Sequence, residues 1–141
     1  MTRGARVLHV EDDAGYATMF QMVLEGENLP VQTASTGNQA LKALRAGSPP
    51  DQREPDGPPA RVVVLDLTLP DMHGTQLLAE VRGDPDLHDV PVVVLTGSRD
   101  RRDLLRCRDL DASDYIVKPD TLEDFTSAVS RIRRWLGPTA R

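Results

Sequence analysis

The sequence predicts an α/β domain in which helices cover both faces of a parallel β-sheet. Short apolar segments suited to strands alternate five times with longer segments suited to helices, the pattern of strand–helix–strand units with right-handed crossovers. The segments at 61–66 and 91–95 carry apolar residues at consecutive positions, which is typical of strands covered on both faces. Polar residues follow several of these strands. Because sites in such sheets lie beyond the carboxyl ends of the strands, we expect the functional site there.

Two strands and two helices are expected in the first third of the chain. The first strand is Arg6–Val10, and acidic residues then lead into a helix at about 14–25. Spacings of three and four residues place a set of its side chains on one apolar face: Tyr16, Met19, Phe20, Val23 and Leu24. A weaker strand at 31–34 precedes a second helix. We expect Asn38 to cap its N-terminus and Gly47 to end it.

Residues 47–60 differ from the rest of the chain in composition. Five of these fourteen residues are proline, accompanied by Gly, Ser, Asp and Glu. Proline fixes φ and removes a backbone donor, so this segment cannot form a helix or bury a face. We expect a surface loop that the fold tolerates, with a partner contact as the alternative.

The remaining strands and helices follow in strict alternation. Strands are expected at 61–66, 91–95 and 114–117, and the first of them leads through a turn into a helix at 75–82. A charged helix runs from Ser98 to about Leu110. The last helix, at about 122–136, carries apolar residues at helical spacing: Leu122, Phe125, Val129, Ile132 and Leu136.

Length and composition limit the kinds of protein that this chain can be. A chain of 141 residues suits one domain, expected to span 1–141 with a short tail at 137–141. A net charge of −5 argues against a nucleic-acid or membrane-surface binder held by bulk charge. One cysteine, Cys107, excludes an intramolecular disulfide and favours a reducing compartment. No apolar run approaches the ~20 residues that span a bilayer. We therefore expect a cytoplasmic location.

The polar residues at the strand ends suit phosphoryl transfer. If the first and third strands are neighbours, Glu11, Asp12 and Asp66 converge, and three carboxylates so close need a compensating charge. Mg²⁺ prefers carboxylate oxygens and water, and often shares its coordination with a phosphoryl group. Thr96 and Lys118 follow later strands and add a hydroxyl and a fixed positive charge. These groups could stabilise a phosphoryl group passing to an Asp66 oxygen.

Four motifs in this order resemble those of a known family. They are Val10-Glu-Asp-Asp13, Leu65-Asp-Leu-Thr-Leu-Pro70 with Gly74, Val94-Leu-Thr96, and Asp114-Tyr-Ile-Val-Lys-Pro119. Together they resemble the response-regulator receiver domain of bacterial two-component signalling, over residues 6–136. The resemblance implies a flavodoxin-like fold with strand order 2-1-3-4-5. It also implies a single receiver domain that is no enzyme toward other substrates, because it catalyses only its own phosphorylation and dephosphorylation.

The resemblance further implies a role for each site residue. Asp66 would accept a phosphoryl group from a phosphohistidine of a sensor histidine kinase. Asp12, Asp66 and the backbone carbonyl of Thr68 would bind Mg²⁺, with Glu11 acting largely through water. Thr96 and Tyr115 would form the switch pair, and Lys118 would contact the phosphate. Asp13 stands where many members carry Asn, so it is not counted as a ligand.

A narrower resemblance points to a partner. The insert before the third strand, Asp84-Pro-Asp-Leu87 and the C-terminal Arg134-Trp-Leu136 resemble stand-alone regulators of bacterial phytochrome kinases. Members of the family often dimerise through the fourth helix, fifth strand and fifth helix, and Trp135 could anchor such a dimer or pack locally. DNA binding would require a recognition helix beyond residue 136. We therefore expect no nucleic-acid partner.

Several residues have a second interpretation. Tyr115 could pack at the sheet edge without switching, and Thr96 could cap the next helix. Arginines cluster on the fourth helix and suit either a solvated face or a partner surface: Arg99, Arg101, Arg102, Arg106 and Arg108. The three histidines lack metal-ligand spacing, and Cys107 is interpreted as structural.

Two other functions remain open on the residues alone. A Mg²⁺-dependent aspartyl phosphatase would also use an acid at the end of a strand, but Thr68 stands where its second acid would be. A flavin-binding module of the same topology would want a phosphate-cradling loop where this chain has Glu11 to Asp13. Turnover of a phosphomonoester would favour the first, and a coloured purified protein the second.

Overall fold

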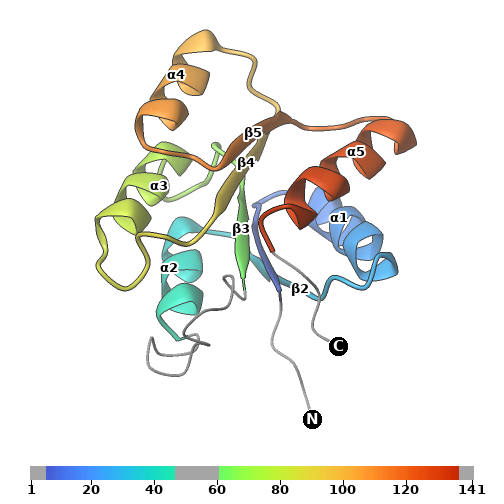
Figure 1. The fold of residues 1–141 in the computed structure, drawn as a ribbon, viewed down its shortest axis with the longest axis horizontal. Coiled ribbons are helices and arrows are strands. Elements are labelled where there is room, and N and C mark those ends of the chain that lie inside the picture. The colour runs from blue at the N-terminus through green and yellow to red at the C-terminus, as the bar shows by residue number, and fades with distance from the viewer. Residues whose placement is uncertain (1–5, 47–60, 137–141) are drawn as a thin grey trace.

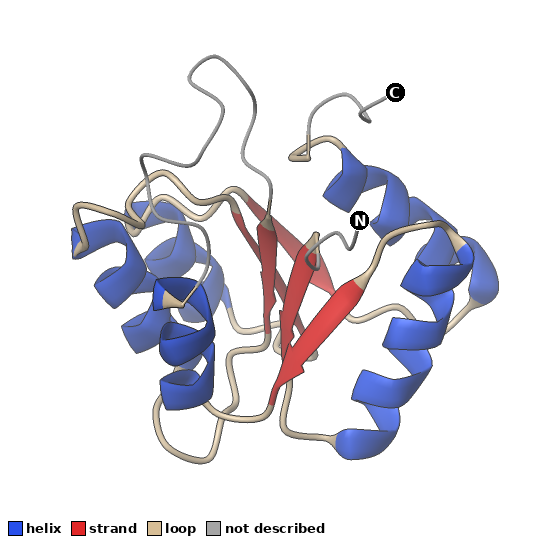
Figure 2. Ribbon diagram, turned by 90° about the horizontal axis from the view of Figure 1, so that it is seen from below, coloured by secondary structure: helices blue, strands red, loops and turns tan. Residues whose placement is uncertain are grey.

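The computed structural model describes residues 6–46 and 61–136 and shows one sheet between two layers of helices (Figures 1 and 2). The expectations for the loop at 47–60, for Gly47 and for the tail at 137–141 lie outside the described residues. Within the described residues no helix is long and apolar enough to cross a membrane.

Within residues 6–46 and 61–136 the sheet has five parallel strands in the order β2-β1-β3-β4-β5, which confirms the predicted topology. The strands are β1 Val7–Val10, β2 Val31–Ala34, β3 Val62–Leu65, β4 Val92–Thr96 and β5 Asp114–Val117. Val10 of β1 pairs with Leu65 of β3, so the two strands end at the same level. The backbone N–H of Asp66 donates to the Val10 carbonyl oxygen at 3.0 Å. This register places the residues after β1 and β3 side by side.

In the described part of the chain, five helices cover the two faces of the sheet (Figure 1). They are α1 Ala14–Gly26, α2 Gly37–Arg45, α3 Gly74–Gly83, α4 Arg101–Asp109 and α5 Leu122–Arg133. One apolar cluster joins residues of α2, α3 and α4 to one face, and a second joins α1 and α5 to the other. In β3, Val63 and Leu65 belong to the first cluster, whereas Val62 and Val64 belong to the second. Alternate side chains point to opposite faces, so both faces need apolar residues and β3 has no polar position.

The helix boundaries differ from the predictions at two caps. Helix α2 begins at Gly37, and Thr36 rather than Asn38 caps it, because the Thr36 Oγ1 accepts from the Gln39 N–H at 3.0 Å. Asn38 therefore lies inside the first turn. Helix α4 begins at Arg101 with Asp100 as its cap, so Thr96 does not cap it. In both cases a polar residue with extended backbone directly before the helix competes successfully for the free N–H groups.

Two residues assigned to apolar faces are exposed. Met19 of α1 is 39% exposed, and Leu122 at the first position of α5 is 80% exposed. Helix α5 ends at Arg133, earlier than predicted, yet Leu136 in the following turn is buried. Spacing alone does not reveal how far a covering helix extends beyond the sheet beneath it, and this extent decides which end positions become buried.

We predict that the Cys107 thiol is inert in the folded protein. The side chain is buried in the cluster beneath α4, and burial raises its pKa to about 11. An unfolded cysteine has a pKa of about 8.5, and the thiolate is the reactive form. At pH 8 the native protein should react with a disulfide reagent far more slowly than the same protein in denaturant. Equal rates in both conditions would contradict this.

Candidate functional site

Three carboxylates meet at the carboxyl ends of β1 and β3. One oxygen each of Glu11, Asp12 and Asp66 lie within 4.8 Å of one another. Glu11 is 3% exposed and Asp66 is 5% exposed, whereas Asp12 is exposed to solvent. The site is therefore partly buried, with Glu11 and Asp66 at its base and Asp12 at its solvent-exposed rim. In the described residues this is the one group of three or more potential metal ligands.

Lys118 supplies a positive charge to this cluster. It follows β5, and its backbone N–H donates to the Thr96 carbonyl at 2.8 Å, which fixes its level at the sheet edge. Its Nζ donates to the Asp66 Oδ2 at 3.1 Å and lies 2.8 Å from the Glu11 Oε1. Lys118 therefore forms ion pairs with both buried carboxylates.

Burial and charge act in opposite directions on these groups. Burial raises the pKa of Glu11, although Lys118 and the Asp13 N–H favour its charged form. Burial would lower the pKa of Lys118, but its contacts with Glu11 and Asp66 outweigh burial and raise it. One ammonium cannot neutralise three carboxylates. The excess negative charge in a partly buried site favours a bound cation.

The donor set fits Mg²⁺. Its groups are carboxylate oxygens, one of them at the solvent-accessible rim, and Mg²⁺ prefers such oxygens together with several retained waters. Asp13 points elsewhere, because its Oδ1 caps α1 by accepting from the Tyr16 N–H at 3.1 Å.

The turn after Asp66 is held close to the carboxylates. The Thr68 backbone N–H lies 3.5 Å from the Asp66 Oδ1, and Thr68 forms an isolated antiparallel bridge with His73. The Gly74 N–H donates to the Leu67 carbonyl at 2.8 Å. The next part of the turn is tied to α2, because the Asp71 carboxylate accepts from the Gly37 and Asn38 N–H groups at 2.8 and 2.9 Å. These bonds fix the backbone on which Asp66 and Thr68 stand.

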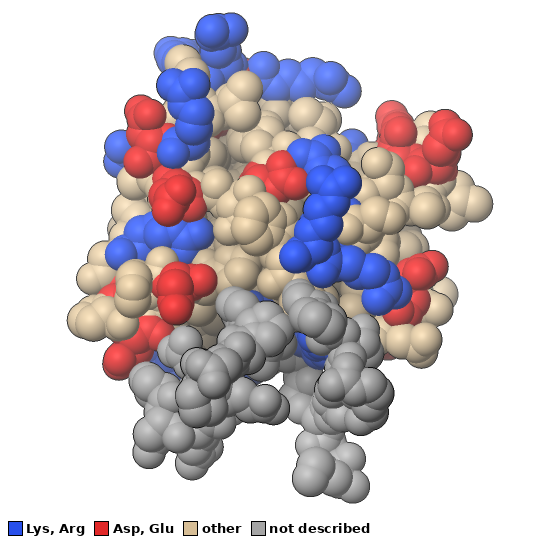
Figure 3. Space-filling model, in the orientation of Figure 1, with Lys and Arg blue, Asp and Glu red and all other residues tan. Residues whose placement is uncertain are grey.

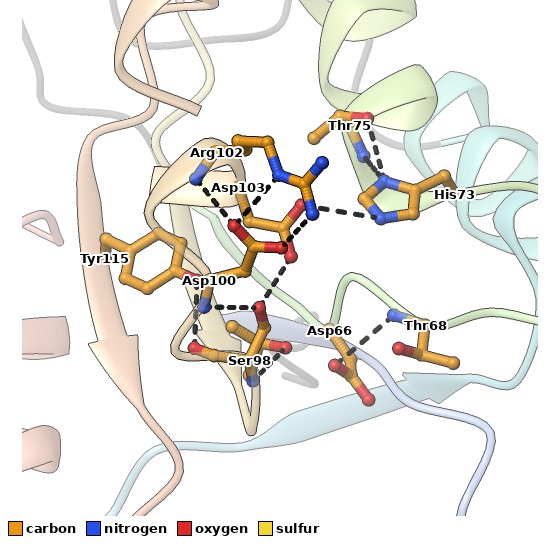
Figure 4. A network of polar contacts seen from close by, with 10 residues as sticks. Asp66, Thr68, His73, Thr75, Ser98, Asp100, Arg102, Asp103 and Tyr115 are labelled. Atoms are coloured by element: carbon orange, nitrogen blue, oxygen red, sulfur yellow. Dashed lines mark hydrogen bonds and ion pairs between the residues drawn. The ribbon is translucent and has the colours of Figure 1, made fainter. Parts of the chain in front are cut away.

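Ser98 connects the loop after β4 to three other elements (Figure 4). Its N–H lies 3.3 Å from the Thr96 Oγ1, and its carbonyl accepts from the Tyr115 hydroxyl at 3.1 Å. Its hydroxyl donates to the Asp103 Oδ2 of α4 at 2.5 Å. Thr96 is buried, whereas Gly97 borders open space, since an added Cβ there would meet nothing within 4 Å. Ser98 thus contacts both predicted switch residues.

Sequence reasoning missed this role of Ser98 and the contribution of His73. The His73 Nδ1 accepts from the Thr75 N–H at 3.2 Å and so caps α3, while its Nε2 lies 3.9 Å from the Asp103 Oδ1 (Figure 4). The sequence signal for Ser98 was its position two residues after Thr96, with Asp103 following in the next helix. It is weak, because the same residues commonly serve as local caps and turns.

Comparison with known proteins identifies the family. Residues 7–130 match the model of the family described as the response regulator receiver domain. The chain belongs to this family. It is therefore the receiver domain of a two-component response regulator, and its cluster of Glu11, Asp12 and Asp66 is compatible with Mg²⁺ and with a phosphorylation site.

Relatives agree with this assignment. The DNA-binding response regulator MtrA of Mycobacterium tuberculosis H37Rv is 36% identical over 134 residues, which are 94% of this chain and 53% of MtrA. The chain thus spans about half the length of this relative. The phosphorylated cyanobacterial phytochrome response regulator RcpA is 29% identical, with a TM-score of 0.76 over 98% of each chain. The Mn²⁺-bound response regulator Rcp1 is 28% identical, with a TM-score of 0.74 over 97% of this chain and 98% of its own.

We predict that Gly74→Ala displaces the backbone beside Asp66. A Cβ at Gly74 would lie 2.6 Å from the Asp66 carbonyl oxygen and 2.7 Å from the Leu67 Cα, and backbone atoms cannot yield as a flexible side chain can. Overpacking of this kind costs about 1–3 kcal/mol. The free energy of unfolding, measured in urea, should fall by that amount.

Gly83 at the other end of α3 provides the matched control. A Cβ there would meet nothing within 4 Å, so Gly83→Ala should change the free energy of unfolding by less than about 1 kcal/mol. If the two variants were equally stable, the close approach of α3 to the end of β3 would not constrain the site.

Proposed function

We propose that this receiver domain accepts a phosphoryl group on Asp66 from a phosphohistidine of a sensor histidine kinase. The observation that carries the proposal is the position of Asp66, a buried carboxylate between a lysine and two further acids. Mg²⁺ would be held by Asp12, Asp66 and the Thr68 carbonyl, with Glu11 acting largely through water. Bound there, the ion would offset the negative charge that otherwise repels an incoming phosphoryl group.

The chain's own groups support the transfer in distinct ways. An Asp66 oxygen forms the new P–O bond as the P–N bond of the phosphohistidine breaks, and the imidazole leaves with the electron pair. The Lys118 ammonium, 3.1 Å from the Asp66 Oδ2, is placed to contact a phosphoryl oxygen. Such transfer depends mainly on positioning and charge neutralisation. The domain thus catalyses its own modification and signals by it, without turnover of a separate substrate.

Phosphorylation would be transmitted through Thr96 and Tyr115. A phosphoryl group adds about 1.5 to 2 negative charges and three acceptor oxygens, which the Thr96 hydroxyl can meet by donating to one of them. The Thr96 Oγ1 now lies 3.3 Å from the Ser98 N–H, and Tyr115 is bonded to the same residue. A shift of Thr96 therefore disturbs the loop that holds Tyr115. This arrangement favours switching over simple edge packing of Tyr115.

The other functions considered from the sequence are less favoured. Family membership disfavours the aspartyl phosphatase, and the second acid that such an enzyme would use is replaced by Thr68. The acids after β1 likewise argue against a flavin phosphate site. For the kinase we propose a bacterial phytochrome, supported by the likeness to RcpA over 98% of both chains. We retain the cytoplasm as the proposed location and propose no nucleic-acid contact by this domain.

We further propose a homodimer through α4, β5 and α5. A groove of about 380 Å³ lies on this side, lined by Tyr115, Pro119 and Arg131 among others. Leu104 of α4 is 45% exposed, and Trp135 after α5 is 37% exposed. Figure 3 shows basic side chains over α4 with acidic ones between them, a mixture that suits charge pairing between two copies. A solvated arginine face, the alternative interpretation, would not explain why Leu104 is exposed among these charges.

We predict that acetyl phosphate and Mg²⁺ add one phosphate to the wild-type protein and none to Asp66→Asn, as measured by intact mass. The amide cannot form the acyl phosphate. Glu80→Gln is the matched control, because this exposed carboxylate on α3 lies outside the cluster, so the variant should still take one phosphate. Equal incorporation in wild type and Asp66→Asn would remove Asp66 as the acceptor.

For the dimer, we predict that Leu104→Asp yields a monomer under conditions in which the phosphorylated wild type is dimeric. A charge placed in an apolar contact must be desolvated without a partner. Light scattering after chromatography gives the mass. Met22→Asp is the control, because Met22 is 71% exposed on α1, a helix that lies on the face of the sheet opposite α4 and forms no part of the proposed surface. A monomeric wild type, with and without phosphate, would refute the dimer.

A further inference from the structure

Lys118 contacts an aromatic ring as well as the carboxylates. Its Nζ lies 4.4 Å from the centroid of the Tyr16 ring, over the ring face. We propose that Tyr16 is a positioning residue for phosphorylation, which holds the Lys118 ammonium at Asp66 through a cation–π contact. This inference rests on the proposed function, because it explains how the phosphate-contacting lysine is kept in place.

The Tyr16 ring is itself fixed by its neighbours. It stacks on Phe20 with centroids 6.2 Å apart and planes 16° apart. Its centroid lies 6.3 Å from that of Phe125 and 6.4 Å from that of His9. These residues belong to α1, α5 and β1, so three elements determine where the ring face points. The ring is therefore a rigid support for the lysine, on the side of the sheet where α1 and α5 lie together (Figure 1).

The surroundings make a cation–π contact effective. The Lys118 side chain is 22% exposed, and the contact strengthens as the ammonium loses water. The two carboxylates also attract the ammonium, but they are the groups proposed to share their charge with a metal ion and, for Asp66, to be esterified. The ring carries no charge and takes part in neither event. It can therefore hold Nζ in the same place before and after the phosphoryl group arrives.

The ring, and not the hydroxyl, makes the contact. The Tyr16 hydroxyl is buried and has no hydrogen-bond partner in the described residues. Burial, with the charges of Glu11 and Asp66, raises its pKa well above the ordinary value, so the phenol stays neutral. A phenylalanine would present nearly the same face to Lys118, whereas a leucine would fill the space without one. This difference provides a matched pair of variants.

The test measures the rate of phosphorylation by acetyl phosphate with Mg²⁺. Tyr16→Leu should slow it about 5- to 30-fold, the range of a partly desolvated cation–π contact, while Tyr16→Phe stays within about 2-fold of wild type. Both substitutions are repeated in Lys118→Met. If Tyr16 acts through the lysine, the loss on changing Tyr16 to Leu disappears there. A wild-type rate in Tyr16→Leu, or an equal loss in both backgrounds, would overturn the proposal.

A second readout does not depend on phosphorylation. An aromatic face shields protons above it, so the Lys118 ε-methylene protons should resonate upfield in wild type and Tyr16→Phe and return to ordinary positions in Tyr16→Leu. Ordinary positions in the wild type would also overturn the proposal. If the wild type took no phosphate, the proposed function would fail, and the methylene shift would then decide by itself whether the ring holds the ammonium.

Discussion

The contact of Lys118 with two buried carboxylates is the interaction on which the rest of the site depends. Glu11 and Asp66 are almost fully buried, and their negative charge is tolerable because the ammonium lies 2.8 and 3.1 Å away. A single cation leaves the cluster negative, which gives it affinity for a second one. The same ammonium also lies over the face of the Tyr16 ring. Three carboxylates and one ammonium leave two negative charges, which one divalent cation would balance.

The two helical layers contribute differently to the site. On the side of α1 and α5, aromatic rings pack under Lys118 and set its position. On the other side, α2 and α4 hold the loops: Asp71 ties the turn after β3 to α2, and Ser98 ties the loop after β4 to α4. One layer therefore supports the charged groups, and the other contains the hydrogen bonds that a displaced Thr96 would break. This division explains how a local change in charge could reach the surface around Tyr115.

Patterns along the chain predicted the fold class and the residues of the central cluster, whereas the strand order was implied by the resemblance to the receiver family. Consecutive apolar residues in β3 and β4 require helices on both faces, and regular alternation with helical segments requires parallel strands. Both constraints act locally along the chain, so pattern reveals them. Asp66 and Lys118 were found because a charged residue directly after a buried strand stands out against its neighbours. Their meeting at one edge followed from the strand order that the resemblance implied, which the sheet confirms.

Contacts between groups of different elements follow only from the packed fold. Thr36 displaced Asn38 as a cap, since the start of α2 is also held by Asp71 from a distant turn. Ser98 contacts Tyr115, which is 17 positions away in the sequence. The ring of Tyr16 contacts Lys118, which is 102 positions away. The periodicity of apolar residues does not predict such contacts. They depend on how α1 and α5 pack on the sheet and on the path of each loop, and the packing of the whole core determines both.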